Sequence, residues 1–238
     1  MTDMTPDPMD RLCARFEIAV SNFGRSCLEM RGNEKAFQAW YAACVIQEFG
    51  LSRVYREVHL DKRQLERLTR GSIPDRDLPR ELTVGNELFP DLSISWEPDI
   101  DARHTNTRDA AVADAGDMLQ QFGILSELKV TGSTGKSTPL KAIRQDLIKL
   151  GLFMAAHKAA TKPPPARIRG LAAYLVIMDN HKKGGSFTSA CRRMDELIPG
   201  KFSWPPSVPR PRILVISAGE PGPPRCDVYQ DFTRLRSV

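Results

Sequence analysis

The sequence predicts an α/β fold with a mixed central β-sheet flanked by α-helices, and three observations support this. Segments with apolar residues at helical spacing are interspersed with short segments whose apolar residues alternate every second position. Residues 171–178 are almost wholly apolar, which is typical of a strand covered on both faces. At 238 residues and 41% hydrophobic composition, the chain can bury one substantial core.

The first third of the chain predicts two helices, a strand and a short helix. Residues 9–30 have apolar side chains at helical spacing. Asn33 is a suitable N-cap for a second helix ending at Gly50, because an asparagine side chain accepts hydrogen bonds from free backbone N–H groups. Residues 54–60 alternate and predict the first strand, and residues 62–69 predict a short helix.

The middle of the chain predicts two further strands and a long helix. Residues 90–96 alternate and form the second predicted strand. Residues 97–117 are polar without apolar periodicity, which favours a long surface loop. Residues 124–130 predict the third strand, and residues 140–160 predict an amphipathic helix that begins after Pro139.

The last part of the chain is rich in proline and less regular. Beyond the apolar run described above, we expect a polar helix over residues 189–197 and a last strand over residues 212–217. The tail, residues 219–238, has the composition of a poorly ordered segment.

Charge and cysteine usage restrict the class of protein. The net charge of +5 gives a mild attraction for polyanions such as nucleic acids, although charge alone does not establish such a partner. The five cysteines lack the close pairing of zinc sites. No basic segment precedes an apolar one at the N-terminus, and no run is long enough to span a bilayer. We therefore expect a soluble cytoplasmic protein without a membrane partner.

Acidic and basic residues at the ends of the second and third strands suggest a chemical site. Residues two apart in a strand point to the same face, so Glu127 and Lys129 project together. If the two strands are antiparallel neighbours, Asp91 lies beside Glu127. Two converging carboxylates bind Mg²⁺ or Mn²⁺, which prefer oxygen ligands. Such a metal supports phosphodiester hydrolysis.

This arrangement resembles the PD-(D/E)xK, or restriction-endonuclease-like, superfamily over residues 33–180. The residues that carry the resemblance are Glu34 in the first core helix, Pro90-Asp91 at the start of a strand, and Glu127-Leu128-Lys129 at the end of the next. The expected organisation is an N-terminal helical extension (1–32), a nuclease-like domain (33–218) and the tail.

The resemblance implies a metal-dependent deoxyribonuclease, most simply an endonuclease, that uses Mg²⁺ or Mn²⁺ and can act as a homodimer. Lys129 would orient the attacking water or stabilise the developing oxyanion. The implied catalytic residues are Asp91, Glu127, Lys129 and Glu34, and the implied metal-binding positions are Asp91, Glu127, Leu128 and Glu34. Residues expected to contact substrate are Lys136, Lys141, Arg144 and Gln145, with Lys149 on the same helix face.

Three alternatives remain open. A second Pro-Asp pair ends at Asp99, which lies beyond the predicted strand, so we favour Asp91. The loop GSTGKST, residues 132–138, is close to a phosphate-binding P-loop, and Asp179 could end a second nucleotide-binding strand. Against this, only one further strand is expected after Asp179. The third alternative is a non-catalytic nucleic-acid-binding module of the same fold.

Overall fold

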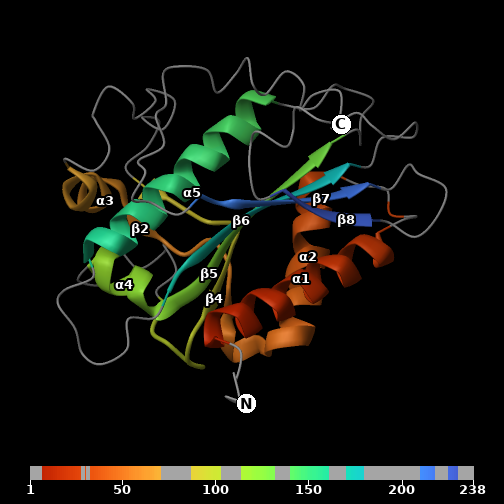
Figure 1. Cartoon of the computed structure of the whole chain (residues 1–238), viewed down its shortest axis with the longest axis horizontal. Coiled ribbons are helices and arrows are strands. Elements are labelled where there is room, and N and C mark those ends of the chain that lie inside the picture. Colours follow the sequence, from red (N-terminus) through yellow and green to blue (C-terminus); the bar gives the residue numbers. More distant parts are fainter. Residues whose placement is uncertain are drawn as a thin grey trace, which may run out of the picture.

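The computed structural model describes residues 7–27, 30, 33–70, 87–102, 114–131, 140–160, 170–179, 210–217 and 225–229. In this part of the chain, helices cover both faces of a mixed six-stranded sheet (Figure 1). The strand order is β1-β4-β5-β6-β7-β8, in which β5, β6 and β7 are parallel to one another and the remaining neighbours are antiparallel. The predicted fold class, a mixed sheet flanked by helices, is confirmed.

One face of the sheet is covered by α1 (Pro8–Ser26) and α2 (Glu34–Phe49). Both helices have side-chain caps, because Asp7 accepts a hydrogen bond from the N–H of Met9 and Asn33 accepts one from the N–H of Ala36. Gly50 ends α2 with a φ of 83°, a conformation that favours glycine. Both predicted helices, including the Asn33 cap, are confirmed.

The other face is covered by α3 (Lys62–Thr69), α4 (Ala115–Gln121) and α5 (Leu140–Ala160). The predicted bounds of α3 and α5 are confirmed. The helix α4 was not predicted, because its first residues lie in the polar stretch assigned to a loop. Asp114 caps it by accepting hydrogen bonds from the N–H groups of Gly116 and Asp117.

The first predicted strand is interrupted in the structure. Residues of β1 (Val54–Tyr55) join the large sheet, whereas β2 (Leu60–Asp61) pairs with β3 (Glu87–Leu88) in a separate two-stranded sheet. Between them Glu57 has a φ of 50°, which ends an extended run. The prediction of one strand over residues 54–60 is therefore wrong.

The centre of the large sheet consists of β4 (Leu92–Ser95), β5 (Phe122–Thr131) and β6 (Ala172–Asp179). In β5, Leu128 packs in the core shared with α1 and α2, whereas Leu125 packs in the core shared with α5. The strand β6 is buried on both faces, as its apolar sequence predicted. This alternation directs the odd-numbered residues of β5 towards α5.

The far edge of the sheet consists of β7 (Arg212–Ser217) and β8 (Arg225–Tyr229). The bounds of β7 match the prediction. The strand β8 lies in the tail that we expected to be poorly ordered, and it pairs antiparallel with β7, so that expectation is wrong for residues 225–229. The predicted helix over residues 189–197 lies outside the described residues. None of the described helices has the length and apolar character needed to cross a membrane.

Candidate active site

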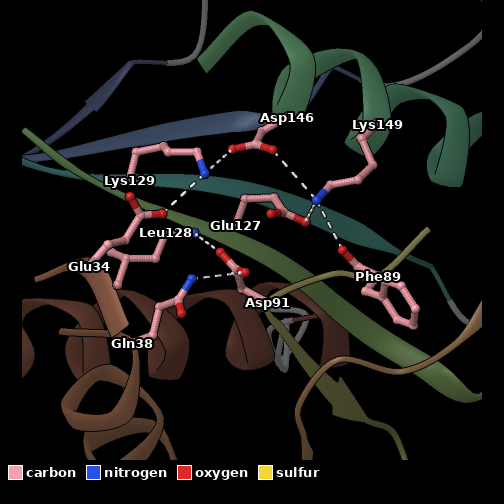
Figure 2. A network of polar contacts seen from close by, with 9 residues as sticks. All are labelled: Glu34, Gln38, Phe89, Asp91, Glu127, Leu128, Lys129, Asp146 and Lys149. Atoms are coloured by element: carbon pink, nitrogen blue, oxygen red, sulfur yellow. Dashed lines mark hydrogen bonds and ion pairs between the residues drawn. The ribbon is translucent and has the colours of Figure 1, made fainter. Parts of the chain in front are cut away.

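The site lies where β5 continues beyond its neighbour β4. The register pairs Leu92, the first residue of β4, with Ser126, whereas β5 continues to Thr131 alongside β6. We call the edge of β5 from residue 127 to 131 the sheet notch. Because β4 does not cover the notch, side chains from the helix layers above and below the sheet can meet there, as Figure 2 shows.

Asp91 lies at the start of the notch, where it directly precedes β4. Its Oδ2 accepts a hydrogen bond of 2.8 Å from the backbone N–H of Leu128, and its Oδ1 accepts one of 3.2 Å from the Nε2 of Gln38 on α2. The carboxylate thus pairs with a backbone group that a neighbouring strand would otherwise bind. In an extended strand the N–H and C=O of one residue point to the same side, so the carbonyl of Leu128 also faces the notch.

Glu127 is the most buried acidic side chain of the site, with 1% of its side chain exposed. Its Oε1 forms an ion pair of 2.8 Å with the Nζ of Lys149 but accepts no hydrogen bond of normal geometry. Burial raises the pKa of Glu127 well above its ordinary value of 4.5, against the lowering effect of the Lys149 ammonium. The carboxylates of Asp91 and Asp146 raise this pKa further.

Lys129 follows Glu127 on the same face of β5. Its Nζ lies 3.0 Å from the Oδ2 of Asp146 and 3.2 Å from the Oε1 of Glu34 (Figure 2). Burial alone would lower the pKa of Lys129, but these two carboxylates raise it above its ordinary value. Lys129 is therefore a cation at neutral pH and a hydrogen-bond donor.

The helix α5 contributes Asp146 and Lys149, three residues apart. The Nζ of Lys149 lies 3.5 Å from the Oδ1 of Asp146 and donates a hydrogen bond of 3.0 Å to the backbone oxygen of Phe89, two residues before Asp91. Lys149 thereby connects α5, β5 and the segment that leads into β4. Burial would lower the pKa of Lys149, but Glu127 and Asp146 raise it.

Four residues singled out from the sequence lie together at the notch: Glu34, Asp91, Glu127 and Lys129. The backbone of Leu128 joins them, while its side chain packs in the core on the other face. Antiparallel pairing of β4 and β5, on which the placement of Asp91 depended, is confirmed. Asp99 lies elsewhere, with a φ of 54° and its N–H bound to the backbone oxygen of Ser52.

The expected substrate contacts are only partly described. Gln145 is half-buried on α5. The side chains of Lys141 and Arg144, and the whole of Lys136 with the GSTGKST loop, lie outside the described residues.

Sequence reasoning missed the contributions of Gln38 and Asp146 and assigned Lys149 to substrate alone. One signal for Asp146 was present. It lies three residues after Ile143 and four before Leu150, both of which are buried, so an acidic side chain interrupts the apolar face of α5. A carboxylate on such a face needs a buried cation as a partner.

The charges at the notch suit a divalent cation. Four carboxylates (Glu34, Asp91, Glu127 and Asp146) stand against two ammonium groups (Lys129 and Lys149), which leaves an excess of two negative charges when all are ionised. Within the described residues no three acidic, histidine or cysteine side chains are arranged to hold an ion. Mg²⁺ commonly needs only one or two carboxylates, with water and substrate oxygens completing its shell.

Comparison with protein-family models gave no match, and comparisons with curated proteins and with solved structures also gave none.

Proposed function

We propose that this protein is a metal-dependent nuclease that hydrolyses DNA phosphodiester bonds. The observation that carries the proposal is the pair of Asp91 and Glu127 at the notch, with the ammonium of Lys129 beside them. Further support comes from the order of elements, because α2, β1, β4, β5, α5 and β6 follow the helix, strand, strand, strand, helix, strand order of the PD-(D/E)xK core that the sequence resembles, with β2, α3, β3 and α4 inserted between them.

Asp91 and Glu127 would hold Mg²⁺ or Mn²⁺, with the carbonyl of Leu128 as a third oxygen ligand and Glu34 at the outer side of the site. When bound, the cation would neutralise charge on the scissile phosphate and help to generate a hydroxide nucleophile. The buried position of Glu127 suits this role, because a cation replaces the solvation that burial removes from its carboxylate.

Lys129 would act as a donor rather than as a base. Asp146 and Glu34 keep its ammonium protonated and fix its position from two sides. A positioned ammonium can donate a hydrogen bond to a phosphate oxygen as negative charge develops on it. Removal of the proton from the attacking water therefore falls to another group.

DNA is the proposed substrate because of the family resemblance and the net charge of +5, which favours a polyanion. Cleavage of both strands of a duplex requires two sites, which favours a homodimer as the active form. The experiment below distinguishes duplex DNA from single-stranded DNA and RNA as the substrate.

The test is cleavage of supercoiled plasmid, linear duplex DNA, single-stranded DNA and RNA with Mg²⁺ or Mn²⁺. The protein would be compared with its Asp91→Asn, Glu127→Gln and Lys129→Gln variants, and with Lys35→Gln as a charge-matched control, since Lys35 is exposed on α2. We expect DNA cleavage that EDTA and each site substitution abolish and that Lys35→Gln leaves intact. Absence of cleavage together with absence of metal binding would contradict the proposal.

A nucleotide-binding function is the second candidate. The parallel neighbours β5 and β6 are joined through α5, as the strand, loop and helix of a P-loop require, and in the described part of the chain two strands rather than the expected one follow Asp179. ATP binding that is lost in a Lys136→Ala variant, without metal-dependent DNA cleavage, would favour this function.

A further inference from the structure

Lys149 occupies the position of a cation at the buried carboxylate of Glu127. Figure 2 shows its side chain reaching from α5 across the notch. Three oxygen atoms surround its Nζ: Glu127 Oε1 at 2.8 Å, the Phe89 backbone oxygen at 3.0 Å and Asp146 Oδ1 at 3.5 Å. With 16% of its side chain exposed, Lys149 is largely withdrawn from solvent. Such a group of oxygens around one positive charge resembles the surroundings of a bound metal ion.

We propose that Lys149 is an internal counter-cation that a divalent metal must displace from Glu127. The inference rests on the proposed function, because it concerns the same metal. In the metal-free protein the Lys149 ammonium balances the Glu127 carboxylate. On metal binding, Glu127 exchanges its lysine partner for the metal, and Lys149 keeps Asp146 and the Phe89 carbonyl as partners.

Burial of an unpaired charge costs free energy. Glu127 is almost fully enclosed, so its carboxylate requires a cation whenever it is ionised. Lys149 meets this requirement without metal. Lys149 therefore allows the Glu127 carboxylate, a proposed metal ligand, to stay buried in the folded chain when no metal is bound.

Two cations at one carboxylate repel each other. Two positive charges that share one carboxylate oxygen a few ångströms apart repel each other strongly in an environment with little water. A Mg²⁺ ion at Glu127 Oε1 would therefore weaken the 2.8 Å ion pair of that oxygen with Lys149. The two cations compete for the same oxygen.

Lys149 has an alternative partner in Asp146. Its distance of 3.5 Å from Asp146 Oδ1 is longer than a strong charged hydrogen bond, so a small movement towards Asp146 would shorten that contact. The two residues are one turn apart on α5, and the exchange therefore requires no change of backbone. Lys149 is thus a positioning residue for Glu127.

The test is the affinity for Mn²⁺ alone, measured by isothermal titration calorimetry at constant pH. We expect Lys149→Gln to bind Mn²⁺ about tenfold more tightly than the unchanged protein, because the competing cation and its repulsion of the metal are gone. Lys149→Arg keeps the charge and should restore weaker binding, and Lys35→Gln should have no effect. A purely structural role for Lys149 predicts the opposite, since loosening the site would weaken metal binding.

A second measurement uses the unchanged protein, which covers the case in which Lys149→Gln does not fold. The ¹⁵N resonance of the Lys149 ammonium, assigned with Lys149→Arg, should shift in step with saturation by Mg²⁺. Lys62, paired with Glu66 at 3.5 Å on α3, serves as the internal control and should not shift.

The outcomes separate this inference from the proposed function. Metal binding by the unchanged protein, combined with equal or weaker binding by Lys149→Gln and a constant Lys149 resonance, would overturn the exchange and leave the nuclease proposal standing. Absence of metal binding in every variant would overturn both.

Discussion

Two polar clusters join helices to strands at different places on the sheet, and they differ in charge balance. The site cluster comprises Glu34, Asp91, Glu127, Lys129, Asp146 and Lys149. The α1-side cluster comprises Glu17 of α1, Tyr174 of β6 and Arg212 of β7. In the latter, the Tyr174 hydroxyl donates to Glu17 Oε1 at 3.1 Å, and Arg212 donates to Glu17 at 3.2 Å and to the Tyr174 hydroxyl at 3.1 Å.

The α1-side cluster is balanced, with one acid and one base, and its charged side chains retain solvent exposure of 31% for Glu17 and 34% for Arg212. The site cluster carries surplus acid, and within it Glu127 is only 1% exposed although Glu34 is 39% exposed. A surface ion pair of the first kind serves packing and contributes little free energy. Burial of a carboxylate is costly unless a cation pairs with it, as Lys149 does with Glu127. Paired charges alone therefore do not mark a functional site.

The largest expected contrast is in activity. Lys129→Gln removes the ammonium proposed to donate to the scissile phosphate, and we expect the rate of plasmid cleavage to fall about 100- to 1,000-fold. Arg212→Gln, the matched change in the α1-side cluster, should leave the rate unchanged. Comparable losses in both variants would mean that the two clusters do not differ in function.

The next contrast is in stability. Lys149→Gln leaves Glu127 buried without its cation, so the free energy of unfolding should fall by about 3 kcal/mol in metal-free buffer. Arg212→Gln leaves Glu17 in contact with solvent and should cost about 1 kcal/mol or less. Urea unfolding monitored by circular dichroism measures both values. Equal losses would remove the distinction between buried and exposed pairs.

The third contrast is in pH dependence. Because burial raises the pKa of Glu127 in the folded state, the folded chain binds a proton more tightly than the unfolded chain. The metal-free protein should therefore lose stability as the pH rises above about 4.5, the ordinary value, by up to about 1.4 kcal/mol per pH unit.

Urea unfolding between pH 4.5 and 8 measures this slope. Glu127→Gln has no titrating carboxyl at this position, so the slope should be absent. Glu17→Gln should show the same slope as the unchanged protein, because Glu127 is still present. The raised pKa values of Lys129 and Lys149 affect stability only above about pH 10, outside this window. An unaltered slope in Glu127→Gln would contradict the assignment to this carboxyl.

The smallest contrast concerns single hydrogen bonds. Gln38→Ala removes the donor to Asp91 and should weaken Mn²⁺ binding about tenfold by loosening a ligand. Tyr174→Phe removes a bond of the α1-side cluster and should cost about 1 kcal/mol of stability without changing Mn²⁺ affinity. Calorimetric titration of both variants makes the comparison, and a change of affinity in Tyr174→Phe would show that the clusters are coupled.

Local signals predicted much of the fold. The Asn33 cap, the helix after Pro139 and the apolar run of β6 depend on neighbouring residues, and each is confirmed. The prediction of one strand over residues 54–60 was wrong because apolar and polar residues alternate in the same way in one continuous strand and in two strands that join different sheets. The positive φ of Glu57 separates these cases, and no glycine marks it in the sequence.

The site was predictable where it follows strand geometry. Asp91, Glu127 and Lys129 meet because of the side-chain period of β5 and the antiparallel pairing with β4. Asp146 and Lys149 belong to a helix whose rotation about its own axis is set by packing against the sheet. A sequence does not show which strand residues a helix face will meet, and the same residues suited a solvated surface equally well.

The hydrogen bond from Leu128 to Asp91 gives this residue a structural role, protection of the strand edge, in addition to its proposed role in catalysis. An asparagine keeps an acceptor for the N–H of Leu128, so Asp91→Asn can silence chemistry and still protect the strand edge, whereas alanine leaves the edge open to pairing with another chain. In a lineage that abandoned hydrolysis, selection for a soluble fold would preserve Asp91, or an asparagine in its place, after Lys129 had been replaced. Among relatives of this chain, retention of Lys129 is thus the more informative signature of a working enzyme.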